Sequence, residues 1–178
     1  WQEDIQTFAP HRTSDIAHGD KSKREKVLFS SARFVMINYD GVKIVEDSIK
    51  KAGFDLIIVD EATHYKNSRS QRWKVLNRIV EKTGCGLWMM TGTPAAQSPL
   101  DAYGLAKLIN PLSVPRFFTG FRDQVMQQVS RFTWVPKPSS INVVHAALQP
   151  AIRFTKEQCM DLPDMLYTKR RVALTPQQ

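Results

Sequence analysis

Apolar residues gather in three short runs, each of which ends at a polar or glycine-containing cluster. The runs cover residues 34–37, 54–59 and 87–90, and they lack the alternation of a strand that has one face in water. Near-continuous runs of β-branched and bulky residues are typical of strands covered on both faces, as in a parallel sheet. The pattern therefore predicts a parallel sheet with helices on both of its faces.

Segments with a helical repeat separate these predicted strands. Residues 42–52, 69–82 and 100–109 carry apolar side chains three and four positions apart, which predicts helices with one apolar face. A glycine follows each of the first two segments, where it is suited to cap the helix. Strands that alternate with helices of this length predict βαβ units, and so an α/β fold.

A polar cluster follows each of the three predicted strands. The clusters cover residues 38–41, 60–64 and 91–94. In parallel sheets, ligands bind at the carboxyl ends of the strands. We therefore expect the chemistry of this protein to lie where these three clusters meet.

The pattern changes after Pro111. Prolines interrupt the chain, aromatic residues are frequent, and residues 122–129 have the repeat of a short helix. We expect two parts: an α/β unit over residues 1–112, and an appended helical or irregular segment over residues 113–178 that lies outside the sheet and bridges toward another lobe.

Charge separates these two parts further. The chain has a formal net charge of +8, with 16 basic and 13 acidic side chains in residues 1–112 and nine basic and four acidic ones in residues 113–178. A basic excess favours polyanionic partners through phosphate contacts and counterion release. The second part, in which aromatic residues are interleaved, suits a surface that tracks a nucleic-acid backbone and stacks on bases. Closely spaced aromatic residues such as Phe117, Phe118 and Phe121 are, however, more often packing residues.

Composition indicates the compartment. No run of eighteen apolar residues occurs, so we expect no membrane span. The two cysteines lie far apart without metal-type spacing, which fits a reducing environment, and we expect a cytoplasmic protein. The chain begins at Trp1 and not at methionine, and we expect it to be a piece of a longer protein.

Asp60 and Glu61 end the second predicted strand as two adjacent carboxylates. In nucleotide hydrolases the first such carboxylate holds Mg²⁺, usually through water, and the second orients or deprotonates the attacking water. Adjacent residues at a strand end can be aimed separately at the metal and at the γ-phosphate. The pair therefore indicates a Mg²⁺-dependent nucleotide hydrolase, although a strand that ends in a solvated acidic turn would give the same pattern.

A second polar motif ends the next predicted strand: Thr91-Gly92-Thr93-Pro94. It places two hydroxyl groups around a glycine at the tip of a buried strand, beside the acidic pair. Such a loop can sense the state of a bound phosphate and pass it to neighbouring segments.

These motifs resemble those of the superfamily 2 helicases, specifically the SWI/SNF-type DNA translocases. The resemblance rests on Asp60-Glu61-Ala62-Thr63 with Lys66-Asn67, and on Met90 to Pro94. It extends over essentially the whole chain, from Trp1-Gln2-Glu3-Asp4-Ile5, through Ile37-Asn38-Tyr39-Asp40, to the segment 161–175, which is similar to the bridge into the family's second lobe. Among members of this family, helicases encoded by bacteriophages have motif sequences most similar to these.

The resemblance implies the C-terminal part of a first RecA-like P-loop NTPase lobe, from a protein whose two lobes clamp ATP and step along double-stranded DNA. It implies that Asp60 holds Mg²⁺ through water and that Glu61 acts on the attacking water. Coupling of hydrolysis to lobe movement falls to Thr91, Gly92, Thr93 and Pro94, and DNA contacts fall to Asn38, Tyr39, Lys66 and Asn67.

The chain departs from the family pattern in four ways. Ala96 and Gln97 stand where the family usually has Gln-Asn, and Arg153-Phe154 stands where it often has paired arginines. Thr63 stands where the family usually has histidine, and His64 follows one place later. No Gly-x-x-x-x-Gly-Lys-Ser/Thr motif occurs, and Gly19-Asp20-Lys21-Ser22 lacks the glycine five places earlier. We expect the phosphate-binding loop and the second lobe in missing parts of a monomeric parent, located in the host cytoplasm if phage-encoded, and no appreciable hydrolysis by this chain alone.

Other functions fit parts of the pattern. A DNA-binding module that keeps the ATPase frame without turnover is the main alternative. Glu61-Ala62-Thr63-His64 has the form of half a di-iron site, and Asp55, Glu61 and Lys66 could form the trio of a metal-dependent nuclease. The sequence leaves open the direction of translocation, the choice between strand separation and remodelling, and the biological pathway.

Overall fold

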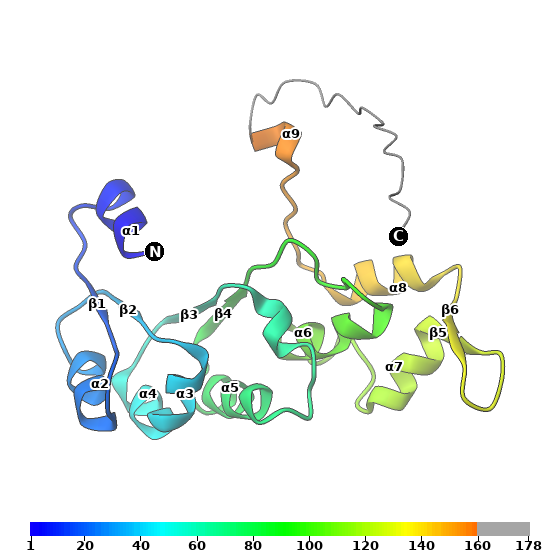
Figure 1. The fold of residues 1–178 in the computed structure, drawn as a ribbon, viewed down its shortest axis with the longest axis horizontal. Coiled ribbons are helices and arrows are strands. Elements are labelled where there is room, and N and C mark those ends of the chain that lie inside the picture. The colour runs from blue at the N-terminus through cyan, green and yellow to red at the C-terminus, as the bar shows by residue number, and fades with distance from the viewer. Residues whose placement is uncertain (160–178) are drawn as a thin grey trace, which may run out of the picture.

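Two pairs of parallel strands follow one another along the first half of the molecule (Figure 1). β1 (Ser14–Ile16) pairs with β2 (Phe34–Met36), and β3 (Leu56–Val59) pairs with β4 (Gly86–Met89). This computed structural model describes residues 1–159. The α/β fold and the strands predicted in residues 34–37, 54–59 and 87–90 are confirmed, and β1 is an additional strand, too short and polar for the apolar pattern to indicate.

Helices connect these strands in the order expected of an α/β fold. The first part contains α1 (Gln2–Phe8), α2 (Lys21–Leu28), α3 (Tyr39–Ile44), α4 (Glu46–Ala52), the 3₁₀ turn η1 (Ala62–Tyr65) and α5 (Gln71–Thr83). The remainder contains η2 (Pro99–Asp101), α6 (Ala102–Ile109), α7 (Phe118–Val125), β5 (Met126–Gln128), β6 (Trp134–Pro136), α8 (Ser140–Ala147) and α9 (Lys156–Cys159).

The helix predicted over residues 42–52 is two helices. Asn38 caps the first, because its side-chain oxygen accepts a hydrogen bond from the Gly41 backbone amide, so helix begins earlier than the apolar repeat. Val45 then leaves helical geometry and separates α3 from α4. Gly53 and Gly84 adopt left-handed conformations at the ends of α4 and α5, as predicted.

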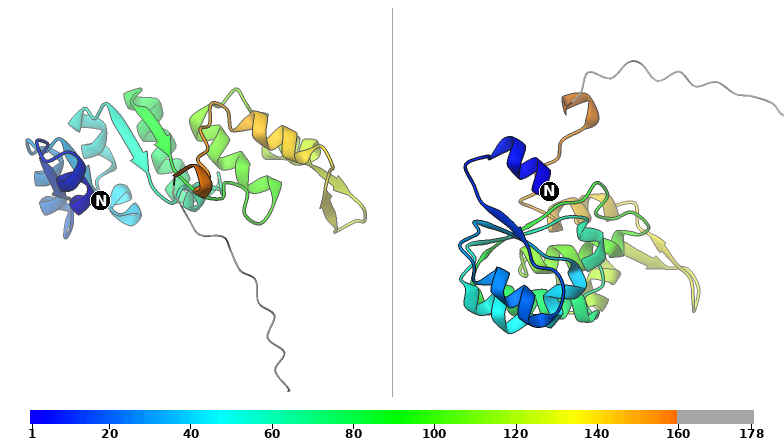
Figure 2. Two further views of the ribbon diagram at one scale, coloured as in Figure 1. Left: turned by 90° about the horizontal axis from the view of Figure 1, so that it is seen from above. Right: turned by 60° about the vertical axis from the view of Figure 1, so that its left-hand side comes forward.

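One face of β3 and β4 is covered by helices. Ile57 and Leu87 point toward the buried side chains of α5 and α6. Figure 2 shows α2, α4 and α5 on the same side of the strands. On the other face, Ile58 is 39% exposed and Trp88 is 61% exposed. Within residues 1–159 the helices thus cover one of the two faces that the sequence pattern predicts to be covered.

Helix α6 joins the strands to the rest of the molecule. Its Leu105 and Leu108 pack with Val59 of β3 and Trp73 of α5. The indole nitrogen of Trp73 also donates a hydrogen bond of 2.8 Å to the carbonyl of Gly104, inside the core. A Cβ added at Gly104 would overlap the backbone carbonyls at the end of η1. A glycine is required here because the α6 backbone lies directly against that turn.

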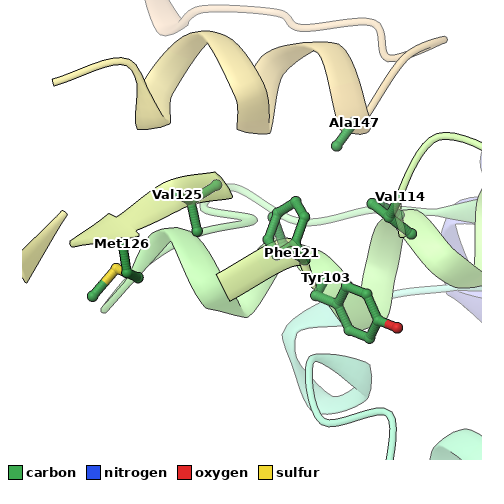
Figure 3. Close-up of a cluster of buried hydrophobic side chains, with 8 residues drawn as sticks. Tyr103, Val114, Phe121, Val125, Met126 and Ala147 are labelled. Atoms are coloured by element: carbon green, nitrogen blue, oxygen red, sulfur yellow. The ribbon is translucent and has the colours of Figure 1, made fainter. Parts of the chain in front are cut away.

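The opposite side of α6 holds the second part of the chain. Figure 3 shows Phe121 and Val125 of α7 in a cluster with Tyr103 of α6, and both α7 residues are fully buried. α7 ends at Val125, and residues 126–128 form β5, so the helix predicted over residues 122–129 is wrong in its second half. The domain boundary at residue 112 stays a prediction, although the core runs across it without a break.

No helix among the described residues is long and apolar enough to cross a membrane.

We expect Gly104→Ala to lower the free energy of unfolding by about 3 kcal/mol, since the new methyl group would force α6 away from η1. Gly92→Ala is the matched control, because an added Cβ there meets no atom within 4 Å. Denaturant unfolding of the two variants measures the difference. Equal stabilities would show that the α6–η1 approach is not a constraint.

Ion pairs of Glu46 with Arg78 and Lys50 make the stability of the fold depend on pH. The Arg78 guanidinium donates two hydrogen bonds to Glu46, of 2.8 and 2.6 Å, and Lys50 donates a third, and these bonds lower the Glu46 pKa from 4.5 to about 2. A lowered carboxyl pKa stabilises the fold above the unfolded-state value, and this contribution disappears as pH falls.

Glu46→Gln should therefore lower the free energy of unfolding by about 1 kcal/mol at pH 7. The difference from wild type should shrink between pH 5 and pH 2, measured by denaturant unfolding at each pH. Glu81→Gln, which removes an α5 carboxylate with no ion pair among the described residues, should show little change at any pH. A difference for Glu46→Gln that is constant with pH would contradict the prediction.

Candidate functional site

The polar clusters after β2, β3 and β4 meet at one edge of the strands. The Met90 amide donates to the Val59 carbonyl at 2.8 Å, and the Ala62 amide donates to the Met90 carbonyl at 2.9 Å. These bonds hold the start of the Thr91–Pro94 loop beside the acidic pair. The Tyr39 hydroxyl, from the cluster after β2, donates to the Asp60 carbonyl. The convergence predicted from the sequence is confirmed.

Asp60 lies at the end of β3 with its carboxylate exposed. One carboxylate oxygen accepts a hydrogen bond of 2.9 Å from the Glu61 amide, and the other accepts one of 2.9 Å from the indole nitrogen of Trp1. Each oxygen keeps a further lone pair, since a carboxylate offers about four acceptor sites. The carboxylate is thus held in orientation and can still bind a hydrated cation.

Glu61 has the left-handed backbone conformation, with φ of 44° and ψ of 52°. It is the one residue other than glycine with positive φ among the described residues. This conformation costs a residue with a side chain about 1 kcal/mol or more, and such strain gathers at functional sites. The turn follows β3 directly, and both Asp60 and Glu61 are exposed.

The Asp60 and Glu61 pair fits Mg²⁺ in its donor chemistry. Mg²⁺ keeps several waters and binds through one or two carboxylates together with substrate phosphates. Asp60 offers one exposed carboxylate, and no cluster of three or more His, Cys, Asp or Glu side chains occurs within residues 1–159. The half di-iron motif at Glu61–His64 therefore has no second half in this part of the chain.

The loop Thr91-Gly92-Thr93-Pro94 begins directly after β4. Its first hydroxyl oxygen, on Thr91, accepts a hydrogen bond of 3.2 Å from the Thr93 amide, which folds the loop back on itself. Gly92 and Thr93 are exposed. The preceding residue, Met90, is hydrogen-bonded to the residues on both sides of the acidic pair, so the loop begins at a fixed point beside the Asp60–Glu61 turn.

Tyr39 lies against the turn that contains the acidic pair. Its ring centre is 4.9 Å from that of His64 and 5.8 Å from that of Tyr65, and the Arg72 guanidinium is 5.0 Å from it. Burial, together with the charges of Asp60 and Glu61, raises the pKa of the Tyr39 hydroxyl. Because its ring lies against Tyr39, His64 faces the polar cluster that follows β2. His64 is one residue beyond the position where the family usually has its histidine.

Asn38 is occupied by contacts within the protein. Its side-chain oxygen accepts hydrogen bonds from the Gly41 amide and from the guanidinium of Arg24, at 3.2 and 3.0 Å. Arg24 is 6% exposed, and it also donates to the carbonyls of Ala17 and Gly19. The sequence pattern gave no sign of Arg24, because a lone arginine in a polar helix normally points to solvent.

Lys66 and Asn67 follow η1 and line a cavity of about 310 Å³. The Lys66 ammonium donates to the side-chain oxygen of Gln97 at 3.0 Å and forms an ion pair of 3.4 Å with Asp101. The Asn67 side-chain oxygen accepts from the Arg69 amide at 2.9 Å. Lys66 thus ties the segment after the acidic pair to the segment after Thr91–Pro94.

Two alternative motifs have no support in the geometry. In Gly19-Asp20-Lys21-Ser22, the Asp20 carboxylate accepts from the Lys23 amide and so occupies the α2 N-terminus where a phosphate would bind. In the proposed nuclease trio, Asp55 precedes β3 and pairs with Arg33 at 3.7 Å, while Glu61 follows β3. The two carboxylates therefore lie at opposite ends of the strand.

The parallel pair β3 and β4, with two carboxylates after one strand and a threonine–glycine loop after the other, has the arrangement expected of a RecA-like fold. The family model of the SNF2-related domain matches residues 1–178. The chain belongs to the SNF2-related domain family. The family resemblance is confirmed, whereas a bacteriophage origin stays a prediction.

Two relatives and one solved structure illustrate the likeness. The ISWI chromatin-remodeling complex ATPase ISW1 of Saccharomyces cerevisiae is 26% identical over 155 residues, 84% of this chain and 13% of that protein. The chromodomain-helicase-DNA-binding protein 1-like of Mus musculus is 26% identical over 171 residues, 92% and 18% respectively. The chain therefore spans less than a fifth of either relative.

The structural match is to the Sulfolobus solfataricus SWI2/SNF2 ATPase core, solved in complex with dsDNA. The TM-score is 0.56 at 21% identity, over 69% of this chain and 25% of that one. The match confirms the RecA-like fold.

Glu61→Gly should raise the free energy of unfolding by about 0.5 to 1 kcal/mol, because glycine adopts positive φ without the steric cost. Glu61→Gln, which keeps a side chain at the same φ, should leave stability unchanged. Denaturant unfolding of both variants is the measurement. A loss of stability in Glu61→Gly would show that contacts of the Glu61 side chain outweigh the strain.

Proposed function

We propose that this chain is the catalytic portion of the first lobe of an ATP-dependent DNA helicase or translocase, which couples Mg-ATP hydrolysis to movement on duplex DNA. The observation that carries the proposal is the junction at Met90, which bonds to both sides of the acidic pair and begins the Thr91–Pro94 loop. A hydrolytic pair and a phosphate-sensing loop gain from this rigid connection, while a passive scaffold has no need of it.

In this proposal Asp60 and Glu61 divide the hydrolytic work. Asp60 orients the hydrated metal, since two hydrogen bonds fix its carboxylate while lone pairs stay free. Glu61 accepts a proton from the attacking water, and its exposed carboxylate is accessible for this role. Bound Mg²⁺ would neutralise charge on the phosphates.

Thr91, Gly92, Thr93 and Pro94 couple hydrolysis to movement in this proposal. The loop meets the acidic turn through Met90 and the η2 segment through the chain that follows. Lys66 spans the same two segments through Gln97 and Asp101. A change at the nucleotide therefore has two routes into α6, and from there into the C-terminal part.

The proposed DNA side of the lobe includes Asn38, Tyr39, Lys66 and Asn67. Tyr39 supports a linking role, because its hydroxyl bonds to the Asp60 backbone while it begins α3. If DNA binding moved the N-terminus of α3, the hydrogen bond from Tyr39 would also move the Asp60 backbone. The amide oxygen of Asn38 is engaged within the protein, which leaves its NH₂ group for a phosphate. The solved SWI2/SNF2 core in complex with dsDNA supports duplex DNA as the partner.

The parent protein would supply what this chain lacks. We propose that a preceding segment with the phosphate-binding loop covers the face of Ile58 and Trp88, and that a second RecA-like lobe follows. We propose further that the parent is a cytoplasmic monomer, in the host cytoplasm if phage-encoded, and that this chain alone does not hydrolyse ATP appreciably.

The test is ATP hydrolysis by the intact protein, with and without duplex DNA. We expect DNA-stimulated turnover that falls at least about 100-fold in Glu61→Gln, because the attacking water loses its base. Glu81→Gln, an exposed carboxylate on α5, is the matched control and should keep full activity.

The 178-residue chain, assayed alone, should stay at background. DNA binding by the intact protein without any turnover would replace this proposal with a non-catalytic DNA-binding module. Turnover by the isolated chain that Glu61→Gln abolishes would refute the need for the missing parts.

A further inference from the structure

The β5–β6 hairpin projects from the end of the molecule opposite to β1 and β2 (Figures 1 and 2). Its two strands are antiparallel, and residues 129–133 form the turn. The Val129 amide donates to the Thr133 carbonyl at 3.0 Å, and the Thr133 amide donates to the Ser130 carbonyl at 3.3 Å. These bonds give the turn a defined shape.

The base of the hairpin is anchored in the body. Val125 and Met126 are buried in the cluster beneath it. The Arg122 guanidinium of α7 lies 4.1 Å from the ring centre of Trp134, the first residue of β6. The Lys137 amide, directly after β6, donates a hydrogen bond of 2.9 Å to the Val125 carbonyl. The hairpin is therefore a supported arm with a free tip.

The tip presents an aromatic ring beside a cation. Phe132 is 85% exposed, and the Arg131 guanidinium lies 5.3 Å from its ring centre. Apart from Val129, the remaining turn residues are polar. A protein-docking patch normally centres on a cluster of large buried anchors. Here Phe132 has only one apolar neighbour in the turn, Val129, which is 56% exposed, and the other turn residues are polar, which favours a different partner.

Charge identifies that partner as a polyanion. Between Asp123 and Glu157 the chain contains no aspartate or glutamate, and it contains Arg131, Lys137, Arg153 and Lys156. The hairpin lies wholly inside this carboxylate-free stretch. Nothing on the arm itself repels a phosphate backbone, while the tip offers both a cation and a stacking surface.

We propose that the hairpin tip is a second DNA contact, in which Phe132 stacks on the face of a base and Arg131 binds the adjacent phosphate. Aromatic side chains in basic surroundings bind nucleic acid in this way, and stacking on one base is worth roughly tenfold in affinity. The inference rests on the proposed function only for the choice of DNA as the polyanion. It adds a site at the far end of the lobe from the acidic pair.

The test is binding of the intact protein to a forked duplex with single-stranded arms, without nucleotide, over a series of salt concentrations. Phe132→Ala should weaken binding about tenfold without changing the salt dependence. Arg131→Ala should also weaken binding, and it should lower the slope of log K against log salt by about one. Phe132→Tyr, which keeps the ring, should bind within about twofold of wild type.

Phe117→Ala is the matched control. Phe117 is 68% exposed and has the Arg116 guanidinium 5.4 Å from its ring centre, so it is a similar exposed pair at the start of α7 and not on the arm. Thermal unfolding of all variants should be unchanged, since these side chains are exposed. Forked-DNA affinities of Phe132→Ala and Phe117→Ala that both equal wild type would overturn the proposal, as would equal losses in both.

A blunt duplex of the same sequence locates the base. A loss confined to the forked DNA places Phe132 on an unpaired base, and an equal loss on the blunt duplex places it between stacked pairs; either supports the contact. The proposed function is tested separately. Wild-type protein without DNA-stimulated ATP hydrolysis would overturn that function, while a specific affinity loss in Phe132→Ala would still support the hairpin contact.

Discussion

The contact between α6 and η1 is the constraint on which the rest of the structure depends. Gly104 lets the α6 backbone lie against the turn that follows the acidic pair, and Trp73 bonds to its carbonyl from α5. The face of α6 toward the strands carries Leu105 and Leu108, and the other face carries Tyr103 toward α7. One helix thus supports the turn after the acidic pair from behind and holds the C-terminal part in place.

The backbone positions the candidate site through two strand ends and one tight turn. Short parallel strands deliver Asp60 and Thr91 to one edge, and Glu61, directly after Asp60, has a left-handed backbone conformation. The cost of that conformation is balanced by the bonds that hold the turn on both sides, from Met90 and from Tyr39. Strain at this position and rigidity around it belong together, because an unsupported turn would relax.

Much of the fold and part of the site could be predicted from the sequence. Residues 56–59 and 86–89 form strands where the apolar runs indicated them, and Gly53 and Gly84 end helices for the expected steric reason. The predicted boundaries of helices and strands were wrong where residues outside the apolar pattern determined them. Asn38 began α3 early, and the polar strand β1 left no apolar signal.

The sequence by itself determined the strand and helix order, the acidic pair and the family resemblance, because these depend on local composition and spacing. Only the tertiary structure decided that Tyr39 meets Asp60, that Lys66 joins Asp101, that Arg24 is buried, and that Phe132 stands free at a hairpin tip. Such facts depend on contacts between residues distant in the chain. A side chain's partners follow from packing, and packing has no period that can be read along a sequence.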